Sequence, residues 1–191
     1  MSYETIQTER LVLRSFRDGD AKLMSDILGD IEVSKNLAGV GHPYTISDAR
    51  KKITELRLAS GHHKFYAMAK KEAANQLIGS ISYGISPDSP LPEFGYWLSP
   101  KCWGNRLMSE AVPIVVAKAF IDHGWDKLVS RYWNPISGRI LDKTGFKPIE
   151  FGHNSWWLLQ GKKVNEIRME LSKVSWAAQQ KGRAALRTTS Y

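Results

Sequence analysis

The stretch EFGYWLSPKCWGNRLMSE, from Glu93 to Glu110, indicates the fold more clearly than any other part of the chain. Glu93 to Leu98 alternates as a strand does, a short loop containing a glycine follows, and an apolar helical pattern begins near Trp103. The first N–H groups of a helix lack backbone partners and carry part of a positive charge. A strand, a loop and a helix in this order can therefore bind an anion if the loop lets it approach.

The patterns on both sides of this stretch predict one domain of mixed α/β class. Before it, we expect a strand at 11–16, a helix over 21–28, a helix capped by Ser47, and strands at 65–69 and 77–83. After it, we expect a helix over 103–123, a strand at 127–132, a helix from Asn134-Pro135 to Gly145, and strands at 146–151 and 164–171. The run of strands from 65 to 98 reads as an antiparallel meander.

Composition limits the classes to which the chain can belong. Its 191 residues fit one ordinary domain, and 42% hydrophobic residues are ample for a core. No stretch approaches the roughly 20 apolar residues that a membrane helix needs, and the polar N-terminus lacks the apolar segment of a secretory signal. Cys102 is the only cysteine, which excludes an intramolecular disulfide. We therefore expect a cytoplasmic protein that does not bind membranes.

Positive charge gathers at the end of the chain. The formal net charge is +8, and residues 171–191 contain four basic residues and no acid. Apolar periodicity fades beyond Trp176, so we expect a domain over 1–175 and a flexible basic tail over 176–191. The rest of the excess either keeps the protein soluble or attracts a polyanion such as a nucleotide-containing cofactor. No nucleic-acid motif accompanies it, so we do not expect nucleic-acid binding.

Four segments, in the same order, resemble the GNAT superfamily of N-acetyltransferases and in particular its RimJ/RimL-type branch. They are Thr8–Arg14, Gly95–Leu98, Trp103-Gly104 followed by Ser109-Glu110-Ala111, and Asn134 and Ser137 with Arg139 through Gly145-Phe146. The resemblance covers roughly residues 8 to 172. It implies a GNAT-like fold: a twisted, mostly antiparallel mixed sheet, splayed at an acetyl-CoA site, with helices on both faces.

The resemblance also implies which residues bind acetyl-CoA. The pantetheine arm would lie in the splay beside Trp97 and Leu98, and Asn134 would contact its amides or simply cap a helix. The pyrophosphate would lie on backbone N–H groups of the loop and first helical turn, formed by Trp103, Gly104, Asn105, Arg106, Leu107 and Met108. Arg106 stands where the family has glycine, and Met108 where it has a small residue. We expect Arg106 to hinder close approach of the phosphates, although a guanidinium can also donate to a phosphate.

Amide formation from a thioester needs a neutral amine, donors for the oxyanion and an acid for the leaving thiolate. Glu93 begins the strand that resembles the family's catalytic strand and is the candidate base; the alternative is an exposed acid at a strand end. Ser137 is the candidate acid or hydrogen-bond donor to the leaving sulfur; the alternative is an ordinary serine of a first helical turn. Glu110 is expected to support its helix rather than catalysis. The histidines lack metal-ligand spacing, so no metal is expected.

The resulting prediction is an enzyme that transfers acetyl from acetyl-CoA to a primary amine. The resemblance points to a protein N-terminal amine as the acceptor, with a small-molecule amine as the other possibility. A catalytically silent module that binds CoA is the alternative, which Arg106 and Met108 favour. We expect residues 42–45 and the helix after them to shape the acceptor side, and the protein to be a monomer or a homodimer.

Overall fold

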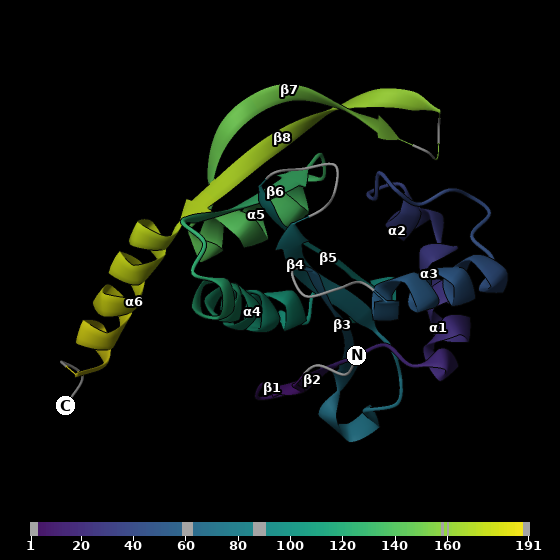
Figure 1. The fold of residues 1–191 in the computed structure, drawn as a ribbon, viewed down its shortest axis with the longest axis horizontal. Helices are drawn as coiled ribbons and strands as arrows, with labels where there is room; N and C mark the ends of the chain where they lie inside the picture. The colour runs from purple at the N-terminus through teal and green to yellow at the C-terminus, as the bar shows by residue number, and fades with distance from the viewer. Residues whose placement is uncertain (1–3, 59–62, 86–90, 158, 160, 189–191) are drawn as a thin grey trace.

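The computed structural model of the chain describes residues 4–58, 63–85, 91–157, 159 and 161–188 (Figure 1). In these residues an eight-stranded sheet has the order β1-β2-β3-β4-β5-β6-β8-β7. Its strands are β1 (Ile6–Gln7), β2 (Leu11–Arg14), β3 (His63–Lys70), β4 (Gly79–Ile85), β5 (Pro92–Leu98), β6 (Lys127–Tyr132), β7 (Lys147–Trp157) and β8 (Lys162–Ser172). Only β5 and β6 pair in parallel among these strands. The expected mostly antiparallel mixed sheet is confirmed.

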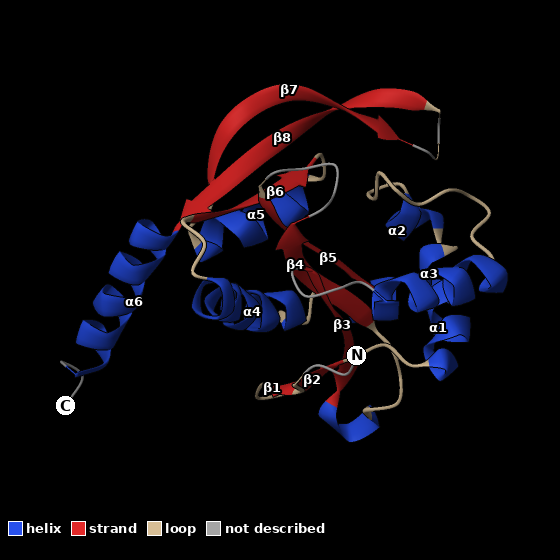
Figure 2. Cartoon of the chain, in the orientation of Figure 1, coloured by secondary structure: helices blue, strands red, loops and turns tan. Residues whose placement is uncertain are grey.

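Helices pack on both faces of the sheet (Figure 2). Helices α1 (Ala21–Leu28), α2 (Ile31–Ser34) and α3 (Ile46–Leu58) lie on one face, and α4 (Leu107–His123) with α5 (Pro135–Thr144) lies on the other. Each face buries its own apolar cluster: one joins the sheet to α4 and α5, and the second joins it to α1, α2 and α3. None of the helices in the described ranges is long and apolar enough to cross a membrane.

Strands β5 and β6 diverge soon after they meet. Within the described residues their parallel pairing is limited to Glu93 opposite Val129, near the start of both strands. The rest of β5 remains paired with β4, and the rest of β6 remains paired with β8. The sheet therefore opens between the ends of β5 and β6, which is the splay that the sequence analysis expected.

The hairpin of β7 and β8 arches over this opening toward α2 (Figure 1). At its far end the ring of Trp157 lies 6.2 Å from that of Trp133, which follows β6. The Nε1–H of Trp133 donates a hydrogen bond of 3.0 Å to the carbonyl of Lys35, at the end of α2. The contact joins the C-terminal hairpin to the N-terminal helices across the open side of the sheet.

Most expected elements are present, with some boundaries moved. Asn134 caps α5, because its Oδ1 accepts a hydrogen bond of 2.9 Å from the N–H of Ile136. Helix α4 begins at Leu107 instead of Trp103, because the residues before it form a loop. Helix α3 is capped by Thr45 rather than Ser47: the Thr45 hydroxyl accepts from the Asp48 N–H at 3.2 Å. Helix α2 was not expected.

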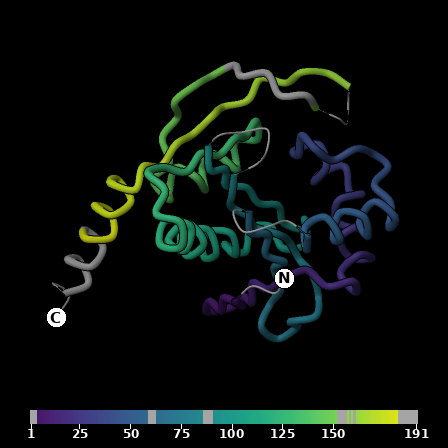
Figure 3. Tube along the Cα trace, viewed as in Figure 1, coloured from purple at the N-terminus to yellow at the C-terminus, as the bar shows by residue number. Residues whose placement is uncertain are grey.

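The C-terminal residues differ most from expectation. We expected no regular structure from Trp176 onward, but Lys173–Thr188 forms helix α6, which extends away from the rest of the molecule (Figure 3). The ring of Trp176 lies 5.3 Å from that of Phe120 in α4. The side chain of Gln179 also lies close to Gly145, at the end of α5. The expectation was wrong because contacts with residues far away in the chain hold the start of this helix against the core. Flexibility of the remaining tail stays a prediction.

Candidate active site

A cavity of about 420 Å³ lies at the opening between β5 and β6. We call it the loop cavity, because the loop before α4 forms much of its wall, together with the end of β5 and the first turn of α5. It is lined by these predicted residues: Trp97, Leu98, Trp103, Gly104, Arg106, Leu107, Met108, Asn134 and Ser137. Asn105 is predicted with them but is not among the lining residues, because its side chain donates to carbonyls of its own loop, those of Cys102 and Trp103.

The loop holds the start of α4 open toward this cavity. Gly104 and Arg106 both have left-handed backbones, with φ of 76° and 59°. The first hydrogen bond of α4 runs from the Glu110 N–H to the Arg106 carbonyl, at 3.1 Å. The N–H groups of Leu107, Met108 and Ser109 therefore have no partner within the helix. Arg106 thus adopts the glycine-like conformation that the family pattern implies, at a cost of about 1 kcal/mol or more for a residue with a Cβ.

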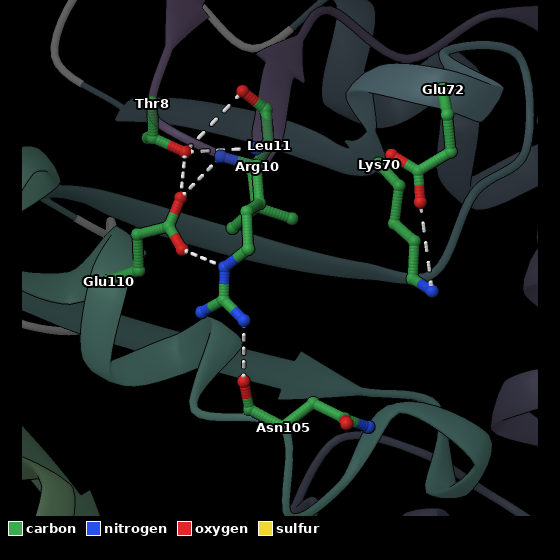
Figure 4. A network of polar contacts seen from close by, with 7 residues as sticks. All are labelled: Thr8, Arg10, Leu11, Lys70, Glu72, Asn105 and Glu110. Carbon is green, nitrogen blue, oxygen red and sulfur yellow. Dashed lines mark hydrogen bonds and ion pairs between the residues drawn. The ribbon is translucent and has the colours of Figure 1, made fainter.

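A polar network ties this loop to the start of β2 (Figure 4). The Glu110 carboxylate accepts hydrogen bonds from the Thr8 hydroxyl, from the Arg10 N–H at 2.8 Å and from Arg10 Nε at 2.7 Å. Arg10 Nη1 also donates to the Asn105 carbonyl at 3.1 Å. Burial acts to raise the pKa of Glu110, but the hydrogen bonds from Thr8 and Arg10 outweigh it and lower that pKa. Glu110 therefore ties the residues before β2 to the start of α4, and it is not among the residues that line the cavity.

The charge of the loop cavity is positive. Arg106 and Arg139 both line it, and no Asp or Glu is found among its described lining residues. The rest of the wall is largely apolar and includes Ile136 and Ile140 of α5 with Leu107 and Met108 of α4. Such a site suits a long molecule with an anionic end and a less polar arm, because the arginines and free N–H groups can receive the anion.

A second cavity of about 260 Å³ adjoins the first and has the opposite charge. We call it the carboxylate cavity, because Glu93 and Glu166 line it together with Arg131. Arg131 pairs with the Glu93 carboxylate through Nη2, and its Nη1 lies 3.5 Å from Glu166 Oε1. The Glu166 side chain is only 2% exposed. Glu93 therefore lines this cavity and not the loop cavity, whereas Ser137 lines both.

Tyr96 lies where the cavities meet, since it lines the loop cavity and the carboxylate cavity alike. Its hydroxyl donates to the Ser137 carbonyl at 3.1 Å, joining β5 to α5 across the opening. Burial raises the pKa of Tyr96, so its hydroxyl keeps its proton. The sequence analysis did not single out Tyr96, although its place between Gly95 and Trp97 already put it on the other face of the strand from these two.

A third cavity, of about 490 Å³, lies between the sheet and α3, and we call it the helix cavity. Tyr96 and Trp97 line it from β5, and Tyr44 lines it from the segment 42–45 that we expected on the acceptor side. Burial, together with the nearby carboxylates of Asp48 and Glu55, raises the pKa of Tyr44 to about 12. Lys51 and Lys52 balance these two acids among the lining residues.

Three charged residues that line the loop cavity or the carboxylate cavity were not predicted as site residues: Arg131, Arg139 and Glu166. Glu93 and Glu166 are far apart in the chain, and only the pairing of β6 with β8 places Arg131 beside Glu166. Arg139 could have been found, because it follows Ser137 on the first turns of α5. In the part of the chain that the structure describes, no group of three or more His, Cys, Asp or Glu residues could hold a metal ion.

Solved structures of similar fold include enzymes that acetylate proteins. The ribosomal-protein-S5-alanine acetyltransferase of Vibrio fischeri superposes with a TM-score of 0.75 at 16% identity, over 91% of this chain and 99% of that chain. RimL, a ribosomal L7/L12 alpha-N-protein acetyltransferase solved in complex with coenzyme A, also gives 0.75, at 17% identity over 88% of this chain and 98% of that chain. These similarities confirm the fold.

Sequence comparison establishes the family. The N-acetyltransferase p20 of Bacillus licheniformis is 32% identical over 130 residues, which are 65% of this chain and 68% of that protein. Residues 10–147 match the sequence model of the family described as Acetyltransferase (GNAT) domain. The matched residues include the loop before α4 and the start of α5. The resemblance seen in the sequence is confirmed, and the chain belongs to the GNAT family of N-acetyltransferases.

Proposed function

We propose that this enzyme transfers the acetyl group of acetyl-CoA to a primary amine, and that its preferred acceptor is a protein N-terminal amine. The observation that carries the proposal is the meeting of two cavities of opposite charge at Tyr96 and Ser137. The loop cavity is lined by two arginines, whereas the carboxylate cavity is lined by two glutamates and one arginine. CoA is a polyanion and an alkylammonium group is a cation, so each substrate suits one cavity.

The residues of the loop cavity fit acetyl-CoA. The unpaired N–H groups at the start of α4 would receive the pyrophosphate, with Arg106 and Arg139 close enough to contribute positive charge. The pantetheine arm would lie beside Trp97 and Leu98 in the splay. Asn134 can serve both roles considered for it, because capping uses only its Oδ1 and leaves its Nδ2–H groups for a pantetheine carbonyl. Once bound, acetyl-CoA supplies a thioester with a good leaving group.

The chemistry requires two protons to leave the ammonium group, one before the attack and one as the amide forms, and the second of these to reach the sulfur. In this proposal the Glu93 carboxylate accepts a proton from the ammonium group, directly or through one water molecule. The neutral nitrogen attacks the carbonyl carbon, the C–S bond breaks, and an N–C bond replaces it. After the attack the nitrogen gives up a second proton. Ser137, which lines both cavities, donates a hydrogen bond to the departing sulfur, and the sulfur takes up this second proton as the C–S bond breaks.

Two observations support a protein N-terminus as the acceptor. The names of the structural neighbours RimL and ribosomal-protein-S5-alanine acetyltransferase identify protein N-terminal or alanine acceptors. The carboxylate cavity and the helix cavity share Leu37, Ala38, Gly95 and Tyr96 in their walls, so residues that follow the amine have room beside it. A small-molecule primary amine is the other acceptor considered. A cytoplasmic location and a monomer or homodimer stay predictions.

The test is acetyl transfer from acetyl-CoA to matched acceptors. One peptide has a free N-terminus and no lysine, a second has a blocked N-terminus and one lysine, and a polyamine is the third acceptor. We expect thiol release, and an added acetyl group found by mass spectrometry, chiefly with the first peptide. Preference for the polyamine or the lysine peptide would refute the N-terminal assignment. Tight binding of CoA without transfer to any amine would support the silent module instead.

A further inference from the structure

Glu166 is a buried carboxylate that the proposed chemistry leaves without a task. It lies on β8, opposite the strand that carries Arg131, and lines the carboxylate cavity. Its side chain is 2% exposed, and its closest charged contact is the 3.5 Å separation from Arg131 Nη1. Arg131 Nη1 is also the donor of its hydrogen bond, at that same long distance. Burial of a carboxylate is costly unless it is closely paired, so its position calls for an explanation.

The balance of charge in this cavity favours a cation. The guanidinium of Arg131 forms ion pairs with both Glu93 and Glu166, and its closer contact is with Glu93. One guanidinium between two carboxylates leaves a formal charge of −1 within walls that include Phe94, Tyr96 and Trp133. An ammonium group bound there would restore neutrality and supply further hydrogen-bond donors to the two carboxylates.

The position of the cavity selects the acceptor as this cation. The carboxylate cavity shares Asn134 and Ser137 with the loop cavity, whereas the helix cavity shares neither. The acids lining the helix cavity are also balanced by Lys51 and Lys52. A cation in the carboxylate cavity therefore lies next to the site that we assign to the thioester, and on the same side as Glu93.

We propose that the carboxylate cavity is the subsite for the ammonium form of the acceptor, and that Glu166 determines its preference for charged amines. The proposal rests on the acetyltransferase function given above and adds a specificity residue to it. Glu93 and Glu166 have different tasks: Glu166 holds the ammonium group, and Glu93 removes its proton. A neutral acceptor of the same shape gains no binding affinity from Glu166.

The first test compares Glu166→Gln with a matched control on the same strand. Glu170→Gln removes a carboxylate that pairs with Lys127 at 2.8 Å and lines none of the three cavities. We expect Glu166→Gln to raise the KM for the amine about tenfold to a hundredfold, the range of a hydrogen bond between charged groups, with the acetyl-CoA Kd unchanged. Glu166→Asp should recover part of this loss. Glu170→Gln should leave KM and kcat at wild-type values.

The second test measures binding. Its decisive comparison is made with the wild type alone, so the result does not depend on whether a variant folds. With CoA present, calorimetry compares a peptide bearing an N-terminal amine with its analogue in which a neutral hydroxyl replaces that amine. We expect the amine to bind at least about tenfold more tightly, and the difference to shrink in Glu166→Gln. Equal binding of the two peptides to the wild type would overturn the proposal.

The two proposals fail in different ways. If the wild type acetylates no amine at all, the proposed function is wrong. If it acetylates amines while Glu166→Gln lowers only kcat or thermal stability, Glu166 merely positions Arg131 and the ammonium subsite is wrong.

Discussion

Replacement of Arg106 by glycine should change both stability and binding, and structure allows the two effects to be separated. Arg106 precedes α4 with φ of 59°, a left-handed conformation. That conformation costs an L-residue roughly 1–2 kcal/mol, and the greater freedom of glycine in the unfolded chain offsets about 0.5–1 kcal/mol of the gain. We expect Arg106→Gly to raise the free energy of unfolding by about 0.5–1 kcal/mol. For a domain of this size, Tm should rise by about 1–4 °C.

The effect on acetyl-CoA binding depends on two opposing properties of the same side chain. Its Cβ stands beside the N–H groups that we assign to the pyrophosphate, whereas its guanidinium can donate to a phosphate. Because backbone contacts require close approach, we expect the steric effect to be larger. Arg139 also lines the loop cavity and remains as a cation. Arg106→Gly should therefore bind acetyl-CoA about fivefold more tightly, which corresponds to about 1 kcal/mol.

Arg106→Ala is the matched control, because it removes the guanidinium and keeps both the Cβ and the left-handed strain. We expect its Tm to match the wild type and its affinity for acetyl-CoA to be no higher. Calorimetric titration of the three proteins at one salt concentration, with thermal unfolding of each, measures both effects. Weaker binding by the glycine and alanine variants alike would identify Arg106 as a phosphate ligand and refute the steric reasoning. A glycine variant no more stable than the wild type would refute the strain argument.

Three further predictions concern other parts of the molecule. Glu93→Gln should lower kcat at least about tenfold with an unchanged acetyl-CoA Kd by calorimetry; an unchanged kcat at saturating acceptor would remove Glu93 from the mechanism. Trp176→Ala should lower the free energy of unfolding in urea by about 1–3 kcal/mol. Truncation after Gln180 should change it by less than about 1 kcal/mol. Equal losses in the two variants would show that the later turns of α6 also pack against the core. Because the folded-state pKa of Glu110 is lowered, its contribution to stability is present at neutral pH and is lost as pH falls through that pKa. On acidification, the wild type should therefore lose more free energy of unfolding, measured in urea, than Glu110→Gln. Equal losses in the two proteins would contradict this.

Local patterns were sufficient to predict most of the elements, whereas the residues that line the loop cavity were predicted from the family resemblance. The cap at Asn134 and the left-handed Gly145 follow from side-chain chemistry within a few residues. The alternating pattern of β5 and the apolar pattern of α4 likewise follow from residues close in sequence. These features depend on neighbours in sequence, so they can be predicted without knowing how distant strands pair.

The features that were missed depend on distant contacts. Glu166 reaches the cavity only because β8 lies beside β6, and nothing in the sequence near Glu166 indicates that pairing. Helix α2 is a single short turn, too brief for apolar periodicity to show. Helix α6 was missed because the contact of Trp176 with Phe120 connects elements that are far apart in the chain. Glu93 was predicted as the candidate base, and the side of the splay on which it lies could not be predicted, because that depends on where β5 and β6 separate.

The strand order has a consequence for how the protein is synthesised. From β2 to β6, each strand pairs with the one made just before it, so the sheet can grow as the chain emerges. Strand β7 breaks this order, because β8 lies between it and β6. At about 5–20 residues per second, the ribosome releases β8 roughly one to three seconds after β7, and until then β7 has no sheet partner. Since Glu166 belongs to β8, a nascent chain completes the carboxylate cavity only with its last strand.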